Sequence, residues 1–193
     1  MAIESFERNV GGIEGLCVVV PKVFGDARGY FTETYNQRDY DEAFGEAIHY
    51  VQDNQSSSTK GVLRGLHFQI NHPQDKLVRV ISGAVYDVAV DLREGSPTYG
   101  KHYGLVLSKE NFKQFFIPKN FAHGFLVLTD TAEFAYKVTD FYHPNDEGGL
   151  MWNDPDIGVE WPLAEYGLTE ADILLSDKDK VNRSFKEYTH HGK

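Results

Sequence analysis

Ionisable side chains interrupt several apolar runs of this sequence. The clearest case is the run from residue 63 to residue 69, where Arg64 and His67 stand among apolar residues. Because an unpaired polar group is costly to bury, these side chains must face solvent or a lined cavity. An imidazole titrates near neutral pH and is suited to accepting a proton. On residue type alone, however, a hydrogen-bonded core histidine is the more common arrangement.

Arg64 is the residue that packing explains least well. A guanidinium cannot lose its proton to become cheap to bury, so Arg64 predicts an anionic ligand or an acidic partner residue. His123, before a glycine in a second apolar run, fits a turn, a core position or a ligand contact. Tyr136 and Lys76 carry no signal of their own, because strand tyrosines usually pack and lone lysines usually extend into solvent.

Short β-rich runs must position these side chains. We expect strands at residues 16–20, 30–35, 49–52, 62–68, 77–81, 85–92, 103–107, 115–117, 125–128 and 133–138. Glycine, proline and asparagine turns separate them, which favours a sandwich or barrel over alternating strands and helices. Residues 85–92 alternate large apolar side chains with Asp and Ala, the period of a strand with unlike faces.

Helical signals are confined to residues 38–47 and 169–175, where Thr169 and Glu170 could cap a short turn. With 193 residues the chain can form one large core, and we expect a single domain over residues 1–193. Its barrel core would span about residues 15–162. The more acidic residues 163–193 would wrap the barrel as short helices and irregular structure.

Composition excludes several classes of protein. The net charge of -10 and the absence of clustered Lys and Arg argue against nucleic-acid binding. Cys17 is the single cysteine, which excludes an intramolecular disulfide framework and a thiolate zinc site. No stretch approaches the roughly 18 apolar residues of a spanning helix. We therefore expect a cytoplasmic protein without a membrane partner.

Five segments resemble dTDP-4-dehydrorhamnose 3,5-epimerases. They occur in order along the chain, at residues 24–29, 51–54, 63–69, 117–125 and 152–162. The likeness runs from about Val19 to Asp179. That family has a cupin-like jelly-roll fold that dimerises. The resemblance therefore implies an all-β jelly-roll barrel with a few short helices, assembled as a homodimer.

The resemblance implies epimerisation of dTDP-4-dehydro-6-deoxy-D-glucose at C3 and C5 to dTDP-4-dehydro-L-rhamnose. This step belongs to dTDP-L-rhamnose biosynthesis, which supplies lipopolysaccharide or cell-wall polysaccharide. Both protons are α to the 4-keto group, so one base, one acid and one electrophile suffice to epimerise either centre through an enolate. No cofactor is expected.

The resemblance assigns these roles to four residues. His67 would be the base, and Tyr136, on the opposite face of the sugar, would return the proton. Lys76 would hold the negative charge that develops on O4. Asp179 would orient His67 and stabilise its charged form. Two other carboxylates could take that place instead, Asp87 and Asp177.

The resemblance also assigns substrate binding to a set of charged, amide and aromatic side chains: Arg28, Glu33, Gln52, Asp53, Asn54, Arg64, Lys76, His123, Phe141, Glu147 and Lys178. The arginines can hold phosphate in a bidentate fork. Phe141 stands where the family has a tyrosine, so a ring that stacks on thymine is retained but its hydroxyl is lost. Tyr30 is another stacking candidate. Arg28 could serve its own pocket or that of a neighbouring subunit.

Other functions remain open. A mono-epimerase or keto-isomerase of a related nucleotide 4-keto sugar would use the same base. A metal-dependent cupin is disfavoured, because Phe68 and Gln69 follow His67 where a His-x-His pair would be expected, and we expect no metal. A non-catalytic sugar-binding barrel would be expected to lack the residue types of His67, Tyr136 or Lys76.

Overall fold

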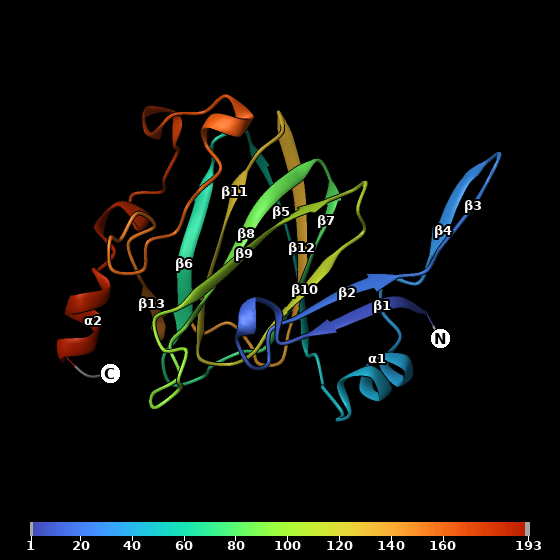
Figure 1. Cartoon of the computed structure of the whole chain (residues 1–193), viewed down its shortest axis with the longest axis horizontal. Helices are drawn as coiled ribbons and strands as arrows, with labels where there is room; N and C mark the ends of the chain where they lie inside the picture. Colours follow the sequence, from blue (N-terminus) through green and yellow to red (C-terminus); the bar gives the residue numbers. More distant parts are fainter. Residues whose placement is uncertain (1, 192–193) are drawn as a thin grey trace.

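Strands dominate the chain. The computed structural model describes residues 2–191 and places most strands in two antiparallel sheets (Figure 1). The larger sheet has the order β1 (Ile3–Arg8), β2 (Cys17–Pro21), β10 (Gln114–Ile117), β7 (Lys76–Ser82), β12 (Thr131–Val138) and β5 (Gln52–Thr59). The smaller sheet has the order β13 (Glu147–Gly149), β6 (Leu63–Gln69), β11 (Phe121–Val127), β8 (Ala84–Asp91) and β9 (His102–Ser108). A separate hairpin pairs β3 (Val23–Asp26) with β4 (Gly29–Thr32).

The two sheets share one hydrophobic core. Phe115 and Phe134 of the larger sheet pack in the same buried cluster as Val85, Leu107 and Phe125 of the smaller one. Removing these apolar side chains from water is the main favourable contribution to such a fold. The all-β class is therefore confirmed. The described strands nevertheless form two main sheets and a separate hairpin but no closed barrel, because no described strand joins the edges of one main sheet to those of the other.

One α-helix covers the outer side of the larger sheet. Asn36 caps the start of α1 (Gln37–Phe44), and Gly45 ends it in a left-handed conformation with a φ of 78°. The helix is therefore shorter than the predicted 38–47. Tyr40 and Phe44 pack into a second buried cluster that includes residues of β2, β7 and β10.

The polar strand β5 departs most from expectation. A strand was expected at residues 49–52, but β5 begins at Gln52 and continues through a serine-rich run. Pairing with β12 supplies its hydrogen bonds, and this outweighs its weak intrinsic preference for strand. Strands β1, β3 and β13 were likewise not expected from the sequence pattern.

The segment after Trp161 is mostly irregular and lies along the smaller sheet (Figure 1). Its short elements are η2 (Ala164–Tyr166), η3 (Glu170–Asp172), η4 (Asp179–Val181) and α2 (Phe185–His191), and a further turn, η1 (Val10–Gly12), lies near the N-terminus. A capping box between Thr169 and Asp172 forms one turn where residues 169–175 were expected to be helical. Bridges from Leu174 to Val62 and from Arg183 to Leu150 tie the segment to the body. The assignment of residues 1–193 to one domain stays a prediction.

The β3–β4 hairpin extends away from the two sheets (Figure 1). Its apolar side chains Phe24 and Phe31 are 59% and 65% exposed. Large apolar side chains gathered on one projecting element are characteristic of a contact surface. Among the described helices, none is long and apolar enough to span a membrane.

Candidate active site

A cavity of about 630 Å³ lies between the two sheets. Eight of the side chains singled out from the sequence line it: Asn54, Arg64, His67, Lys76, His123, Tyr136, Glu147 and Asp179. Strands β5, β6, β11 and β12 each direct polar groups into the same space. Arg64 and His67 are three residues apart on β6, and a register shift in the pairing of β6 with β11 between them lets both face the cavity although strict alternation would not. The segment after Trp161 adds Asp179 from outside the sheets.

His67 and Asp179 form a hydrogen-bonded pair on one wall. Nε2 of His67 lies 2.5 Å from Oδ1 of Asp179. The hydroxyl of Ser176 donates to the other carboxylate oxygen at 2.7 Å. Burial alone would raise the pKa of Asp179, but the hydrogen bonds from His67 and Ser176 lower it. Asp179 is therefore a carboxylate that fixes the ring through Nε2. The other ring nitrogen, Nδ1, lies 3.8 Å from Oε1 of Glu147 and is the one that could accept a proton.

Each of the other two carboxylates considered for His67 has a different partner. Asp87 pairs with His123, and Asp177 pairs with Lys180. The geometry therefore associates His67 with Asp179. The two residues are 112 positions apart in the sequence. They meet because the segment after Trp161 folds back and places η4 beside β6.

Tyr136 lies on the opposite sheet from His67. It belongs to β12, whereas His67 belongs to β6, and both line the cavity. Burial, together with the charge of Glu147, raises the pKa of the Tyr136 phenol, while Arg64 opposes this. The phenol is therefore neutral at physiological pH and can act as a proton donor.

Lys76 shares a desolvated region with a second acid and histidine pair. Both carboxylate oxygens of Asp87 lie 3.0 Å from Nε2 of His123. Burial raises the pKa of Asp87 and lowers that of His123, and their pairing opposes both changes. Burial also lowers the pKa of Lys76 to about 8, although Asp87 and Glu147 attract its charge. Lys76 is therefore cationic at neutral pH and poorly solvated, as a group that stabilises developing negative charge should be.

Arg64 reaches the cavity without an acidic partner. Its guanidinium donates to the hydroxyl of Ser58 at 3.0 and 3.1 Å, and among residues 2–191 no carboxylate forms an ion pair with it. The side chain is exposed, so the strand position does not impose the burial cost inferred from the sequence. The sequence predicted either an anionic ligand or an acidic partner residue for Arg64, and this arrangement favours an anionic ligand.

The cavity edge near β13 carries a further charged and aromatic group. Glu147 contacts the ammonium of Lys178 and accepts a hydrogen bond from the Tyr142 hydroxyl at 3.0 Å. Burial alone would raise the pKa of Glu147, but the Lys178 contact and the nearby His67 lower it. Gln52 accepts from the main-chain N–H of Tyr142 at 3.2 Å. Gln52 and Lys178 thus lie next to the cavity without lining it.

Other residues expected to bind substrate are not brought into this cavity. Arg28 and Tyr30 lie on the projecting hairpin, where Arg28 pairs with Asp26. Glu33 follows that hairpin and contacts Asn36 at 3.5 Å. Asp53 pairs with Lys137 at 2.8 Å and lines a separate cavity on the other face of its strand.

Phe141 is 59% exposed and lies on the loop after β12 without lining the cavity. The neighbouring Tyr142 does line it. The loop therefore presents the ring of Tyr142 to the cavity and leaves the adjacent ring of Phe141 exposed to solvent.

Several cavity residues were not predicted as site residues from the sequence. Ser176 orients Asp179, Gln69 and Gln74 line the cavity floor, and Phe134 adds an aromatic wall. Gln69 could have been noticed, because it lies two residues after His67 on the same strand and so shares its face. Among residues 2–191, no group of three or more His, Cys, Asp or Glu side chains is arranged to hold a metal ion. The expected absence of a metal stays a prediction.

Comparison with known proteins bears on this arrangement. A profile of the dTDP-4-dehydrorhamnose 3,5-epimerase family matches residues 11–187. The enzyme of that name from Pseudomonas aeruginosa is 53% identical over 167 residues, covering 86% of this chain and 89% of that protein. The crystal structure of the Legionella pneumophila dTDP-6-deoxy-D-glucose-3,5-epimerase in complex with dTDP-4-keto-L-rhamnose has a TM-score of 0.87 and 46% identity, covering 94% of this chain and 93% of that one.

A more distant similarity concerns a related activity. ChmJ, a 3'-monoepimerase from Streptomyces bikiniensis solved with dTDP-quinovose, has a TM-score of 0.81 and 31% identity, covering 89% of this chain and 84% of that one. The sequence identity is higher with the two 3,5-epimerases, at 53% and 46%, than with this 3'-monoepimerase, at 31%. The expected family and its jelly-roll fold are thereby confirmed, and the chain belongs to the dTDP-4-dehydrorhamnose 3,5-epimerase family.

Proposed function

We propose that this chain epimerises dTDP-4-dehydro-6-deoxy-D-glucose at C3 and C5 to dTDP-4-dehydro-L-rhamnose, as an isomerase of dTDP-L-rhamnose biosynthesis. The observation that carries the proposal is the placement of His67, paired with Asp179, on one sheet and Tyr136 on the other. A sugar ring held between them would have a base on one face and an acid on the other. Inversion requires that arrangement.

The proton balance is simple. Nδ1 of His67 takes the proton from C5 or C3, and the electron pair of that C–H bond moves into an enolate with its charge on O4. Tyr136 then donates its phenolic proton to the same carbon from the opposite face. Exchange with solvent returns the imidazolium and the phenolate to their starting forms, so no net proton is consumed. The same residues serve both carbons in turn.

Lys76 stabilises the enolate in this scheme. Its ammonium lies in the desolvated part of the cavity near Asp87 and Glu147. A cation placed before the reaction starts stabilises the charged intermediate more than the neutral ketone. That difference lowers the barrier to proton removal.

The nucleotide would occupy the cavity edge formed by the aromatic loop and β13. Arg64 and Lys178 would supply positive charge for the diphosphate. Arg64 suits this role because its guanidinium binds the Ser58 hydroxyl and, among the described residues, no carboxylate, whereas Lys178 also contacts Glu147. Phe141 and Tyr142 offer rings for thymine, and Gln52 and Asn54 offer amides. His123 would contact the sugar from β11.

We infer that the working unit is a homodimer in which the β3–β4 hairpin enters the neighbouring copy's site. The exposed Phe24 and Phe31 provide an apolar contact surface. Arg28 and Tyr30 on the hairpin, and Glu33 directly after it, do not line the cavity of their own chain. Asp53 lies on the outer face of β5, away from the cavity that holds His67. In such a dimer it would contact the partner subunit, or substrate bound in the partner's site. We further expect the enzyme to work in the cytoplasm, where its lone Cys17 stays reduced.

Mixing two inactive variants tests the shared site. Arg28→Ala and His67→Ala subunits are mixed, allowed to exchange and assayed for epimerisation. If Arg28 serves the neighbour, each mixed dimer has one complete site, and activity returns to a substantial fraction of wild type. If it serves its own site, mixing restores nothing. Sedimentation analysis of the same samples checks the dimer.

The activity itself is tested by incubating pure, chelator-treated protein with dTDP-4-dehydro-6-deoxy-D-glucose and identifying the products by NMR. The L-rhamno product is expected, and a His67→Ala variant that still binds dTDP should form none. A product inverted at C3 alone would favour the mono-epimerase alternative that the ChmJ similarity keeps in view. Loss of activity on chelation would contradict the metal-free scheme.

A further inference from the structure

Two loops join the strands that carry the proposed catalytic groups. Residues 70–75 connect β6, which holds His67, to β7, which begins at Lys76. Residues 139–146 connect β12, which holds Tyr136, to β13, which begins at Glu147. Both loops lie at the same end of the sheets, and the second carries Phe141 and Tyr142. Interactions that hold the first loop against the second therefore also fix the positions of Phe141 and Tyr142.

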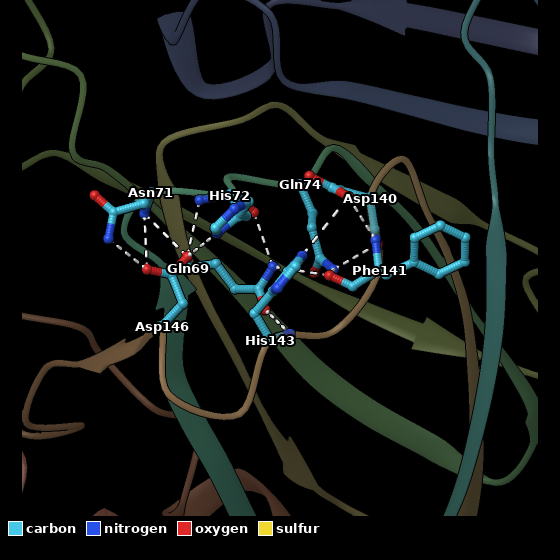
Figure 2. Close-up of polar contacts among 8 residues, drawn as sticks. All are labelled: Gln69, Asn71, His72, Gln74, Asp140, Phe141, His143 and Asp146. Carbon is cyan, nitrogen blue, oxygen red and sulfur yellow. Dashed lines mark hydrogen bonds and ion pairs between the residues drawn. The ribbon is translucent and has the colours of Figure 1, made fainter.

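Gln69 connects the two loops through its side-chain amide (Figure 2). Its Nε2 donates to the main-chain oxygen of His72 at 2.8 Å and to that of Phe141 at 3.3 Å. Its Oε1 accepts from the main-chain N–H of His143 at 2.7 Å. The amide thus holds the main chain on both sides of Tyr142. The side chain is buried, with 8% of the residue exposed, so water competes poorly for these bonds.

Asp146, at the end of the second loop, binds the first loop through hydrogen bonds. Its carboxylate accepts from the main-chain N–H groups of Asn71 and His72 and from both of their side chains, at distances of 2.7 to 3.0 Å (Figure 2). Burial alone would raise the pKa of Asp146, but these hydrogen bonds lower it to about 2. The His72 carbonyl that Gln69 binds is therefore held in place independently of Gln69.

Two further contacts complete this connection. Nε2 of Gln74 donates to the main-chain oxygens of Asp140 and Phe141 at 2.7 and 3.1 Å. The rings of His72 and His143, both drawn in Figure 2, are stacked. Their centroids are 3.9 Å apart. Gln69 is the member of the group that lies on a strand of the smaller sheet, two residues from His67. It therefore links the loops to the rigid body of the protein.

We propose that Gln69 is a positioning residue for nucleotide binding, which holds the Phe141–Tyr142 segment at the cavity edge through its main chain. This rests on the proposed function, since the segment's ligand is the dTDP moiety. Gln69 acts through the two rings and not by touching the nucleotide. Its loss therefore raises the KM for the nucleotide sugar and the Kd for dTDP and leaves the chemical step largely intact.

The test compares dTDP binding by calorimetry and steady-state kinetics in wild type and Gln69→Leu. We expect the Kd and KM to rise about ten-fold, with kcat changed less than about three-fold. Thr129→Val is the matched control, because its hydroxyl also joins main-chain groups, accepting from Ala84 at 2.9 Å and donating to Thr131 at 2.8 Å, at the other end of β12. That variant should leave both constants unchanged.

A background without the rings separates positioning from direct contact. In a Phe141→Ala, Tyr142→Ala protein, adding Gln69→Leu should change the Kd less than two-fold. A further ten-fold loss there would mean that Gln69 touches the nucleotide, and would overturn the proposal. Failure of the wild-type protein to bind dTDP would instead overturn the proposed function, and this inference with it.

Hydrogen exchange provides a readout that needs no ligand. The amide of His143, which donates to Gln69, should exchange at least ten-fold faster in Gln69→Leu, while amides of β8 keep their rates. Unchanged exchange at His143 would show that the segment is held without Gln69 and would likewise overturn the proposal.

Discussion

Replacing Lys76 with methionine should make the protein more stable while nearly abolishing its activity. Burial lowers the pKa of Lys76 from 10.5 to about 8, a net value that already includes its attraction to Asp87 and Glu147. At about 1.4 kcal/mol for each pH unit, this difference corresponds to roughly 3 kcal/mol of unfavourable free energy in the folded state. Because the ammonium borders an open cavity, solvent screens part of this cost, and we expect a gain of about 1–2 kcal/mol.

The sign of this effect depends on pH. Below about pH 8 both folded and unfolded chains carry the Lys76 proton, so the wild type bears the full cost. Between about 8 and 10.5 the folded chain releases the proton while the unfolded chain keeps it, and the stability of the wild type rises. The advantage of Lys76→Met should therefore be complete at pH 7 and should shrink as the pH approaches 10.5.

Urea unfolding at pH 7 and pH 10 measures this difference, with thermal unfolding expected to shift by roughly 3–6 °C at pH 7. Lys109→Met is the control, since Lys109 is exposed and should change stability by no more than about 0.5 kcal/mol. In the same variant kcat should fall about 10²- to 10³-fold. A less stable Lys76→Met protein at pH 7, or an equal gain at both pH values, would refute the argument that Lys76 is a poorly solvated cation.

Three other substitutions test separate parts of the account. Asp179→Asn should lower kcat about 10³-fold with dTDP affinity unchanged, because His67 loses the carboxylate that orients it; equal activity would exclude the pair from catalysis. Tyr136→Phe should let His67 exchange substrate protons with solvent without inversion, and normal product formation by that variant would remove Tyr136 from the mechanism. Gly65→Ala should destabilise the fold by at least about 2 kcal/mol in urea unfolding, because the added Cβ would lie 2.5 Å from Cα of Gly124; unchanged stability would contradict the close approach of β6 and β11.

Strands with alternating apolar side chains could be located from the sequence. The predicted strand at residues 77–81 lies within β7, and that at residues 85–92 matches β8 within one residue at each end. Their β-branched residues favour a pleated, half-buried surface. Strand β5 could not be located in the same way, because its serines and amides form a strand only through pairing with β12.

The site was predictable only in part. The resemblance associated His67 with Asp179, but composition and periodicity could not, because the contact depends on how the segment after Trp161 folds back onto β6. The opposite orientation of Asp53 and Asn54 does have a sequence signal, since adjacent residues of a strand point to different faces. The place of Arg28 has no such signal, because neither composition nor periodicity indicates whether a projecting hairpin serves its own cavity or that of a neighbouring copy.

The central claim is that one base on one sheet and one acid on the other invert both carbons of the substrate. The most direct test follows deuterium from solvent into dTDP-4-dehydro-6-deoxy-D-glucose by NMR, in wild type and in His67→Ala. We predict deuterium at both C3 and C5 of the product in wild type and at neither carbon in His67→Ala. Inverted product without deuterium at either carbon, or full labelling by His67→Ala, would contradict the account.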